Sequence, residues 1–296
     1  MALEKMINPS KELNAIVSPE VPAEDAESPR HQEAKRTAIN LLARRTAKSL
    51  RFPNPVILED KDHKFTIDGE ERVAAGTYHS GTGEIKLYPK HIVKVDDAPY
   101  IMAHEIGHHK FNTVQDLETK EFMALDKNKA HKALLEQTLK VNSPSYHPDL
   151  AKHYPVAAAM HNAFHVSADG SGNGNDELAE SDGVTKYSRE WWEAHKKGTA
   201  DRMQAVDETH AELSALHHDT SKQYDRYDAS HSPENRVRKE RVVASLLRTY
   251  HGVHPRWLNI HRVINEIYND HMDKVQWKQA QERQEKQDAR TKSKDK

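Results

Sequence analysis

The chain has 296 residues, of which 36% are hydrophobic, and a formal net charge of −2 at pH 7. A charge so close to zero provides no bulk attraction to nucleic acid or to an anionic membrane surface, so we expect neither as a partner. The chain has no cysteine, which excludes disulfides, cysteine nucleophiles and thiolate metal sites and leaves histidine and the carboxylates as strong metal ligands.

The length allows one large domain or two small ones, but a mean hydropathy of −0.93 indicates that much of the chain is solvated helix, loop or tail. Residues 1–30 are rich in proline, glutamate and serine and are expected to form a disordered arm. The arm has no apolar signal core, and no later segment is apolar enough to span a membrane. We therefore expect a cytoplasmic protein, while delivery inside a virus particle or by a signal-free secretion machine stays open.

The first predicted helix begins around His31 and ends near Leu50, because Pro53 and Pro55 stop it. Strand signals follow at residues 56–58, 64–67, 73–79 and 84–88. Gly81-Thr82-Gly83 has the composition of a hairpin turn between the last two strands. A small antiparallel sheet is therefore expected directly ahead of the next helix.

Asp97 and Pro99 predict the start of that helix, with a capping carboxylate and a proline in the first turn. The helix carries His104-Glu105-Ile106-Gly107-His108, in which two imidazoles lie one turn apart on one face. Two histidines at this spacing can bind one Zn²⁺, and Glu105 between them can take a proton from a water held at the ion. Gly107 costs about 1 kcal/mol of helix propensity relative to alanine, so its presence predicts the close approach of another backbone.

Beyond this motif the helical pattern continues to about Val141. Residues 144–182 mix proline, histidine, asparagine and glycine and are expected to form an insertion or lid. Residues 279–296 are rich in lysine, glutamine and glutamate and are expected to form a charged disordered tail. Between these two segments, helices are predicted from about Ser188, over 199–218, over 234–250, and from Pro255 to about Gln281.

A tetrahedral catalytic zinc needs a third protein ligand and one open position. Phe111 and Val114 stand where a third-histidine pattern would need glycine and histidine, so that pattern is excluded. Glu208 is the preferred third ligand, because its helix combines an apolar packing face with a second carboxylate, Glu212, one turn further on. In this arrangement Glu208 binds the ion and Glu212 orients one of the two histidines. The carboxylates that remain as alternatives are Glu177, Glu180, Glu190 and Glu193.

The sequence His104-Glu105-Ile106-Gly107-His108, followed by Glu208-Thr209-His210-Ala211-Glu212, resembles the gluzincin zinc metallopeptidases. It looks closest to phage-associated and anthrax-lethal-factor-like members, whose distal helix carries a Glu-x-x-Ala-Glu element. The resemblance covers residues 35–220 and implies one zinc ion per chain, held by His104, His108 and Glu208. It also implies that Tyr187, in Val184-Thr185-Lys186-Tyr187-Ser188, stabilises the oxyanion, although Tyr187 lies further ahead of Glu208 than is usual. About a hundred residues separate His108 from Glu208, which requires a sizeable insertion.

The expected protein is therefore α+β. A zincin-like metallopeptidase domain is expected over residues 31–220, with the insertion or lid inside it at 144–182. A C-terminal helical extension over 221–278 follows and could bind a protein partner.

The resemblance implies a zinc-dependent endopeptidase that acts on a protein or peptide substrate through a water activated by Glu105. The strand at 73–79 or the strand at 84–88 is expected at the sheet edge, where it could pair with an extended substrate. Two alternatives stay open. One is a virion or host-interaction protein that keeps the fold as a structural or binding part, and the other is an intracellular protease that cleaves a repressor.

Overall fold

The computed structural model describes residues 28–124, 155–156, 158–159, 184–227 and 233–294. The described residues form a mixed α+β fold that is mostly helical, with a small sheet. The expected arm up to residue 27 and nearly all of the expected insertion or lid at 144–182 lie outside these residues. Among the described helices, none has an apolar stretch long enough to cross a membrane.

The chain divides into two compact units. Unit 1 comprises Met1–His109 and Ser181–Pro255, and unit 2 comprises Lys110–Glu180 and Arg256–Lys296. The sequence-based division into a domain over 31–220 and an extension over 221–278 differs from this. Its boundary falls inside a single helix, α9 (Arg202–Tyr227), which packs against α10 (Pro233–His251) within unit 1.

Unit 1 begins with helix α3 (Pro29–Ser49), whose first turn is capped by the Ser28 side chain accepting from the His31 amide at 3.2 Å. A sheet of three strands follows, in the order β1 (Val56–Leu58), β5 (Glu84–Leu87) and β4 (Gly76–His79). β4 runs antiparallel to β5, as the predicted hairpin at Gly81–Gly83 requires, but β1 runs parallel to β5. The expectation of an antiparallel sheet is thus wrong for β1, because the chain crosses over between β1 and β5 instead of returning through a tight turn.

The crossover contains a separate two-stranded hairpin of β2 (Lys64–Ile67) and β3 (Glu70–Val73). Its turn is Asp68-Gly69, where both residues have positive φ, 50° and 82°, as the favoured tight hairpin turn demands. The prediction of one strand over 73–79 is therefore wrong. That segment is split between the end of β3 and the whole of β4.

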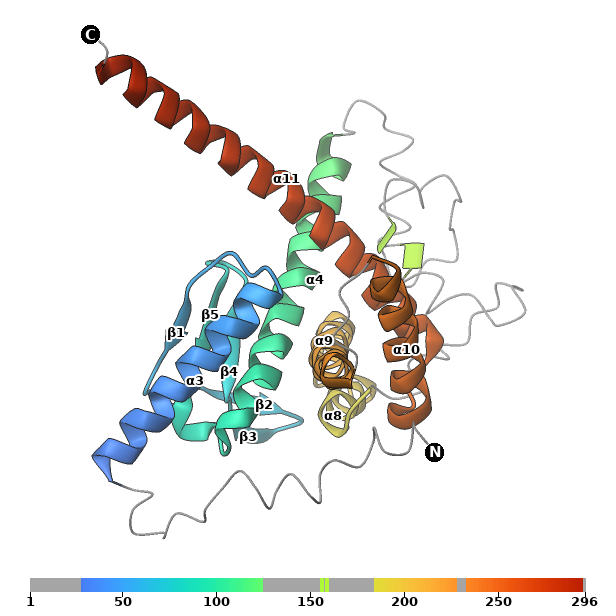
Figure 1. The fold of residues 1–296 in the computed structure, drawn as a ribbon. Helices are drawn as coiled ribbons and strands as arrows, with labels where there is room; N and C mark the ends of the chain where they lie inside the picture. Colours follow the sequence, from blue (N-terminus) through green and yellow to red (C-terminus); the bar gives the residue numbers. More distant parts are fainter. Residues whose placement is uncertain (1–27, 125–154, 157, 160–183, 228–232, 295–296) are drawn as a thin grey trace. The chain divides into compact units, whose positions relative to one another are not determined.

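Helix α3 and the first part of α4 (Ala98–Ala124) pack beside the three-stranded sheet (Figure 1). Two short 3₁₀ turns, Pro89–His91 and Val95–Asp97, lead from β5 into α4, which begins directly after Asp97 as predicted. The core between these elements consists of fully buried apolar side chains, which include Ile39, Ile85, Leu87, Met102 and Ile106. Because Met102 and Ile106 anchor one side of α4 in this core, the position of the other side of the helix is also fixed.

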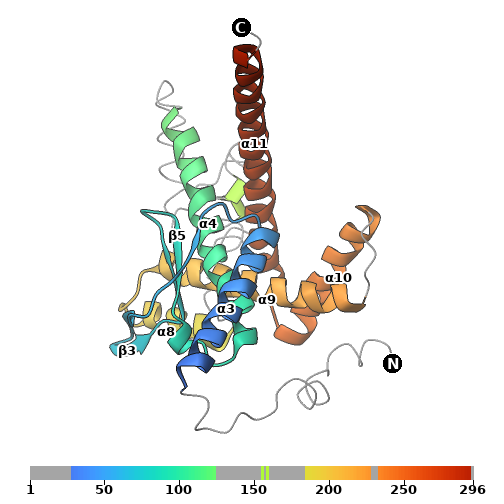
Figure 2. The same ribbon diagram turned by 60° about the vertical axis from the view of Figure 1, so that its left-hand side comes forward.

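Helices α8 (Lys186–Lys196), α9 and α10 complete unit 1 (Figures 1 and 2). In unit 2, α11 (Pro255–Lys294) buries a stripe of side chains at helical spacing, Trp257, Ile260, Ile264, Tyr268 and Met272. The helix continues through the segment 279–296 up to Lys294, where a disordered tail was expected. The reason is that the glutamine, lysine, glutamate and arginine of this segment, although too polar to pack, have good intrinsic helix propensity.

Candidate metal centre

Helices α4 and α9 cross in close contact at Gly107. A Cβ added at this glycine would lie 2.6 Å from the Cα of Ala211 and 3.0 Å from the Ser214 side chain. This confirms the prediction that a second backbone approaches Gly107. Because Glu208 lies one turn before Ala211 on α9, the crossing also brings Glu208 towards the two histidines of α4.

Three potential ligand atoms converge where the two helices meet. The Nε2 atoms of His104 and His108 lie 3.1 Å apart, and each lies 3.5 Å from Oε2 of Glu208. A tetrahedral ion with bonds of about 2.0–2.1 Å holds its ligand atoms about 3.3 Å from one another. Oε2 of Glu208 is buried and has no hydrogen-bond partner among the described residues. The three side chains fit a metal ion and could hold one.

A carboxylate of α9 contacts each histidine at Nδ1, the ring nitrogen that does not face the point of convergence. Oε1 of Glu212 lies 2.8 Å from Nδ1 of His104, and Oδ1 of Asp207 lies 2.9 Å from Nδ1 of His108. A carboxylate at Nδ1 keeps the proton on that nitrogen and leaves the Nε2 lone pair directed at the ion. The sequence predicted that Glu212 would contact one of the two histidines, and in the structure this histidine is His104. The role of Asp207 was missed, and its position directly before Glu208 is the signal that could have revealed it.

Glu212 is itself held by a hydrogen bond from α4. The hydroxyl of Tyr100, on the first turn of α4, donates to Oε2 of Glu212 at 3.1 Å. The two carboxylate oxygens of Glu212 thus contact two different residues of α4, His104 and Tyr100. These two contacts hold the face of α9 that carries Glu212 against the histidine face of α4.

The charges of the site are strongly coupled. Burial lowers the pKa of His104, but its close contacts with the carboxylates of Glu208 and Glu212 outweigh burial and raise that pKa to about 10. Burial raises the pKa of Glu208, but the neighbouring His108 and His104 outweigh it and lower that pKa to about 2. Without a metal, the cluster therefore holds protonated imidazoles against an ionised carboxylate. A bound cation would replace these protons.

Glu105 lies between the two histidines in the sequence and is buried beside β4. A Cβ added at Gly76, the first residue of β4, would lie 2.8 Å from Oε1 of Glu105, so only a glycine lets the strand pass this close. Burial raises the pKa of Glu105 above its usual value, against the opposing effect of His104 and His108. A carboxyl group with a raised pKa is suited to accepting and returning a proton near neutral pH.

Tyr187 reaches the same centre from α8, 21 residues before Glu208 in the sequence. Thr185 caps the start of α8, and the indole of Trp192 donates to Oγ1 of Thr209 at 2.9 Å, which ties α8 to α9. The Tyr187 ring lies edge-on to the His104 ring with 5.9 Å between centroids. Burial, with the nearby charge of Glu208, raises the pKa of Tyr187, so that its hydroxyl stays a hydrogen-bond donor.

The alternative third ligands do not join this group. Glu190 pairs with Arg72 at 2.8 Å and Glu193 with Lys196 at 3.2 Å, and neither belongs to the group of possible metal ligands among the described residues. Glu177 and Glu180 lie outside the described residues. His109, the residue after His108, is buried with its ring edge-on to Phe52, with 5.0 Å between centroids.

The arrangement thus places a metal-binding group, a buried carboxyl of raised pKa and a phenol donor around one point of unit 1. Comparison with models of known protein families, with curated proteins and with solved structures found no match. The chemistry of the site therefore has to be inferred from this chain's own residues.

Proposed function

We propose that the protein is a zinc-dependent peptidase of the gluzincin type. The observation that carries the proposal is the convergence of His104, His108 and Glu208, from two helices a hundred residues apart in the sequence, beside the buried Glu105. Two imidazoles and one carboxylate, with a further position left open, are a common ligand set of catalytic zinc in peptidases. Carboxylates behind both imidazoles support the same assignment.

Bound zinc would polarise the carbonyl of the scissile peptide and make a water acidic enough to lose a proton near neutral pH. Glu105 accepts that proton as the water attacks and then donates it to the leaving amine. Tyr187 donates a hydrogen bond to the carbonyl oxygen as negative charge develops there. The raised pKa values of Glu105 and Tyr187 support these two roles.

The substrate is proposed to be an extended peptide that pairs with β4. Of the two strands that the sequence offered for this role, β5 lies in the centre of the three-stranded sheet, and in the described part of the chain β4 forms an edge. An edge strand can add a peptide through main-chain hydrogen bonds. Gly76 at the start of β4 would place such a peptide next to Glu105.

The test begins with metal content. Protein prepared without chelator should contain one zinc per chain, and His104→Ala should lose it, because one of three ligands is removed. His217→Ala, at a histidine that lies further along α9 and pairs with Glu240, serves as the control and should keep the metal. Parent protein without stoichiometric zinc would defeat the proposal.

Glu105→Gln separates a peptidase from a binding protein that has kept the fold. The amide cannot accept a proton, so hydrolysis of a peptide cut by the parent should be abolished while zinc stays bound. Near-normal turnover by this variant would show that the assigned base is wrong. A parent protein that binds zinc but cuts no peptide in a broad library would favour the structural or binding alternative.

A further inference from the structure

The main chain of β4 alternates in the direction that its peptide groups face. The carbonyl of Ala75 accepts from the Tyr88 amide at 2.9 Å, so the main-chain amide and carbonyl of Ala75 point towards the chain of β5. The main-chain amide and carbonyl of Gly76 therefore point the opposite way, towards the outer edge of the sheet. Ala74, two residues before Gly76, faces this edge too, but its amide already donates to the carbonyl of His63 at 2.9 Å. His63 thus occupies the outer edge at Ala74, and a substrate paired with β4 would meet His63 two residues past Gly76.

His63 leads into the β2–β3 hairpin, and this hairpin is tied to α8. Arg72 of β3 pairs with Glu190 of α8 at 2.8 Å. At the turn of the hairpin, Asp68 pairs with Lys197 and accepts from the Thr199 hydroxyl at 3.4 Å. Figures 1 and 2 both show the hairpin beside α8. The hairpin therefore connects the edge of β4 with the helix that carries Tyr187.

The side chain of His63 is also held in place. Its ring stacks on Tyr88, with 5.9 Å between centroids and 16° between planes, and the preceding Asp62 lies 2.8 Å from Nε2 of His91. These contacts join the base of the hairpin to the residues that follow β5. The hairpin is thus attached on both sides, which makes it a fixed wall at this end of β4.

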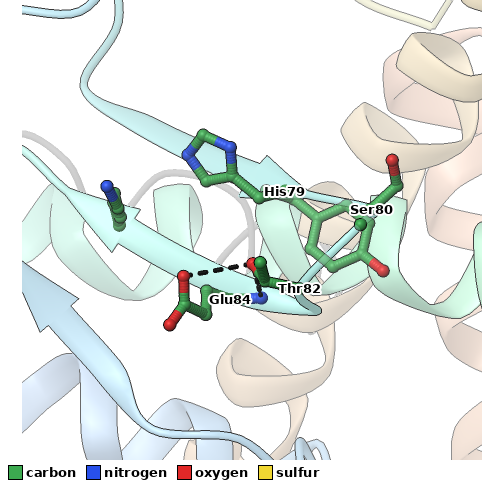
Figure 3. Close-up of a pocket in the computed structure, with 7 residues that line it drawn as sticks. His79, Ser80, Thr82 and Glu84 are labelled. Atoms are coloured by element: carbon green, nitrogen blue, oxygen red, sulfur yellow. Dashed lines mark hydrogen bonds between the residues drawn. The ribbon is translucent and has the colours of Figure 1, made fainter.

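The other end of β4 differs in the described part of the chain. There the strand enters the β4–β5 turn, and a pocket of about 480 Å³ is lined by residues of that turn and of both strands, among them His79, Ser80, Thr82 and Glu84 (Figure 3). Among the described residues, this pocket leaves room for a peptide paired with β4 to extend in this direction. The two ends of the strand therefore differ in the described part of the chain, with the hairpin next to Gly76 and the pocket next to His79.

We propose that the β2–β3 hairpin limits substrates to about two residues on the C-terminal side of the scissile bond. Antiparallel pairs are commoner than parallel ones and have the stronger ladder, so the substrate runs against β4, from the pocket towards Gly76 and Glu105. Two residues of strand span about 7 Å, which is the run from Gly76 to the position taken by His63. This inference rests on the proposed function and narrows it to a peptidase that cuts close to the C-terminus of its substrate.

The first experiment compares two series of peptides cut at the same bond by the zinc-loaded parent protein. In one series the segment after the scissile bond has one, two, four or eight residues, and in the other the segment before it is lengthened equally. The value of kcat/KM should fall by about tenfold or more beyond two residues in the first series and stay level in the second. Equal cleavage throughout the first series, or a fall confined to the second, would overturn the inference.

A second experiment loosens the hairpin. Arg72→Gln combined with Lys197→Gln removes both ion pairs between the hairpin and α8. The value of kcat/KM for the peptide with the eight-residue extension should then rise by about threefold or more. A rise of this modest size is expected because each exposed ion pair contributes only weakly to holding the hairpin. Cleavage of the short peptides should not change. Lys64→Gln is the matched control, because it breaks an exposed ion pair to Glu71 at 2.7 Å that lies within the hairpin and does not reach α8.

Because the chain has no cysteine, the hairpin can also be fixed by a selective cross-link. Arg72→Cys with Glu190→Cys, joined by a short bismaleimide, should keep the parent's preference for short C-terminal segments. Long and short peptides changing together in every variant would mean that the hairpin has no role in selection. If zinc-loaded parent protein cuts no peptide at all, the proposed function itself is wrong and the length limit falls with it.

Discussion

The residues that hold the two imidazoles should matter for metal affinity nearly as much as the imidazoles themselves. Asp207→Asn and Glu212→Gln each keep the shape of the side chain but weaken the contact with a histidine Nδ1, so each should lower zinc affinity by about 10–100-fold. Glu208→Ala should lower it further, because a ligand and a charge are both lost. Competition with a coloured chelator measures all three. Asp219→Asn is the control, because Asp219 lies on the same helix and its carboxylate accepts from the Gln223 side chain at 2.9 Å.

An affinity unchanged by Asp207→Asn would remove that residue from the site. Equal losses for Glu212→Gln and Glu208→Ala would mean that the roles of the two glutamates are wrongly divided.

The metal-free protein should be most stable in a defined pH window. The pKa of His104 is raised from 6.5 to about 10 in the fold, so its stabilisation is complete below pH 6.5 and is lost as the pH rises towards 10. The pKa of Glu208 is lowered from 4.5 to about 2, so its stabilisation is complete above pH 4.5 and is lost as the pH falls towards 2. Urea unfolding in the presence of chelator should therefore give the largest free energy of unfolding between about pH 4.5 and 6.5.

The matching variant is His104→Asn, which should flatten the alkaline side of this profile. A free energy of unfolding that stays level from pH 6.5 to 10 in the parent would contradict the charge state assigned to the metal-free cluster.

The sequence predicted the residues that α4 brings to the candidate site better than the residues that α9 brings to it. His104, Glu105 and His108 are related by helical spacing alone, so a pattern over five residues contains the information. Glu208 could only be preferred over four other glutamates, because its contact with the histidines depends on how two helices cross. Asp207 and Tyr100 were missed for the same reason, because the contact that each makes runs between α4 and α9.

At the scale of elements, the errors lie where a short apolar segment had two possible partners. Residues 73–79 were predicted as one strand, but the tight turn at Asp68-Gly69 pairs β3 with β2 and leaves Ala74 and Ala75 as a link to β4. The Asp-Gly pair is a strong hairpin signal, and reading it would have corrected the strand boundaries. The parallel pairing of β1 with β5 has no comparable local signal.

The crossing of α4 and α9 should fail when Gly107 gains a methyl group. In Gly107→Ala the new Cβ would meet backbone of α9 at 2.6 Å, so the helices must separate. Overpacking of this kind costs about 1–3 kcal/mol, which outweighs the gain of about 1 kcal/mol in helix propensity. Both the free energy of unfolding and the zinc affinity should fall, as measured by urea unfolding and chelator competition.

Gly81→Ala is the control for this variant, because a Cβ at Gly81 meets nothing within 4 Å. A Gly107→Ala protein that is as stable as the parent and binds zinc as tightly would show that the two helices can separate without disturbing Glu208.

At the scale of the whole molecule, the division into units does not follow the order of the sequence. Unit 1 combines an early and a late segment, and α4 passes from unit 1 into unit 2 between His109 and Lys110. A division read along the chain assumes that each domain is continuous, which is why the expected boundary at 220 fell inside α9. All the residues proposed to bind the ion or act beside it belong to unit 1.

Zinc should therefore stabilise unit 1 before it stabilises anything else. A ligand that binds only the folded site at a thousand times its dissociation constant adds about 4.1 kcal/mol of stability, which slows exchange through unfolding of the site by about a thousandfold. In hydrogen exchange with and without chelator, the largest change is expected in α9 and in residues 98–109 of α4, whose packing the ion joins directly. Amides around Tyr268 of α11, in unit 2, should change less. A uniform change over both units would mean that the chain unfolds as one cooperative body, and a change centred on α11 would place the metal outside the site formed by His104, His108 and Glu208.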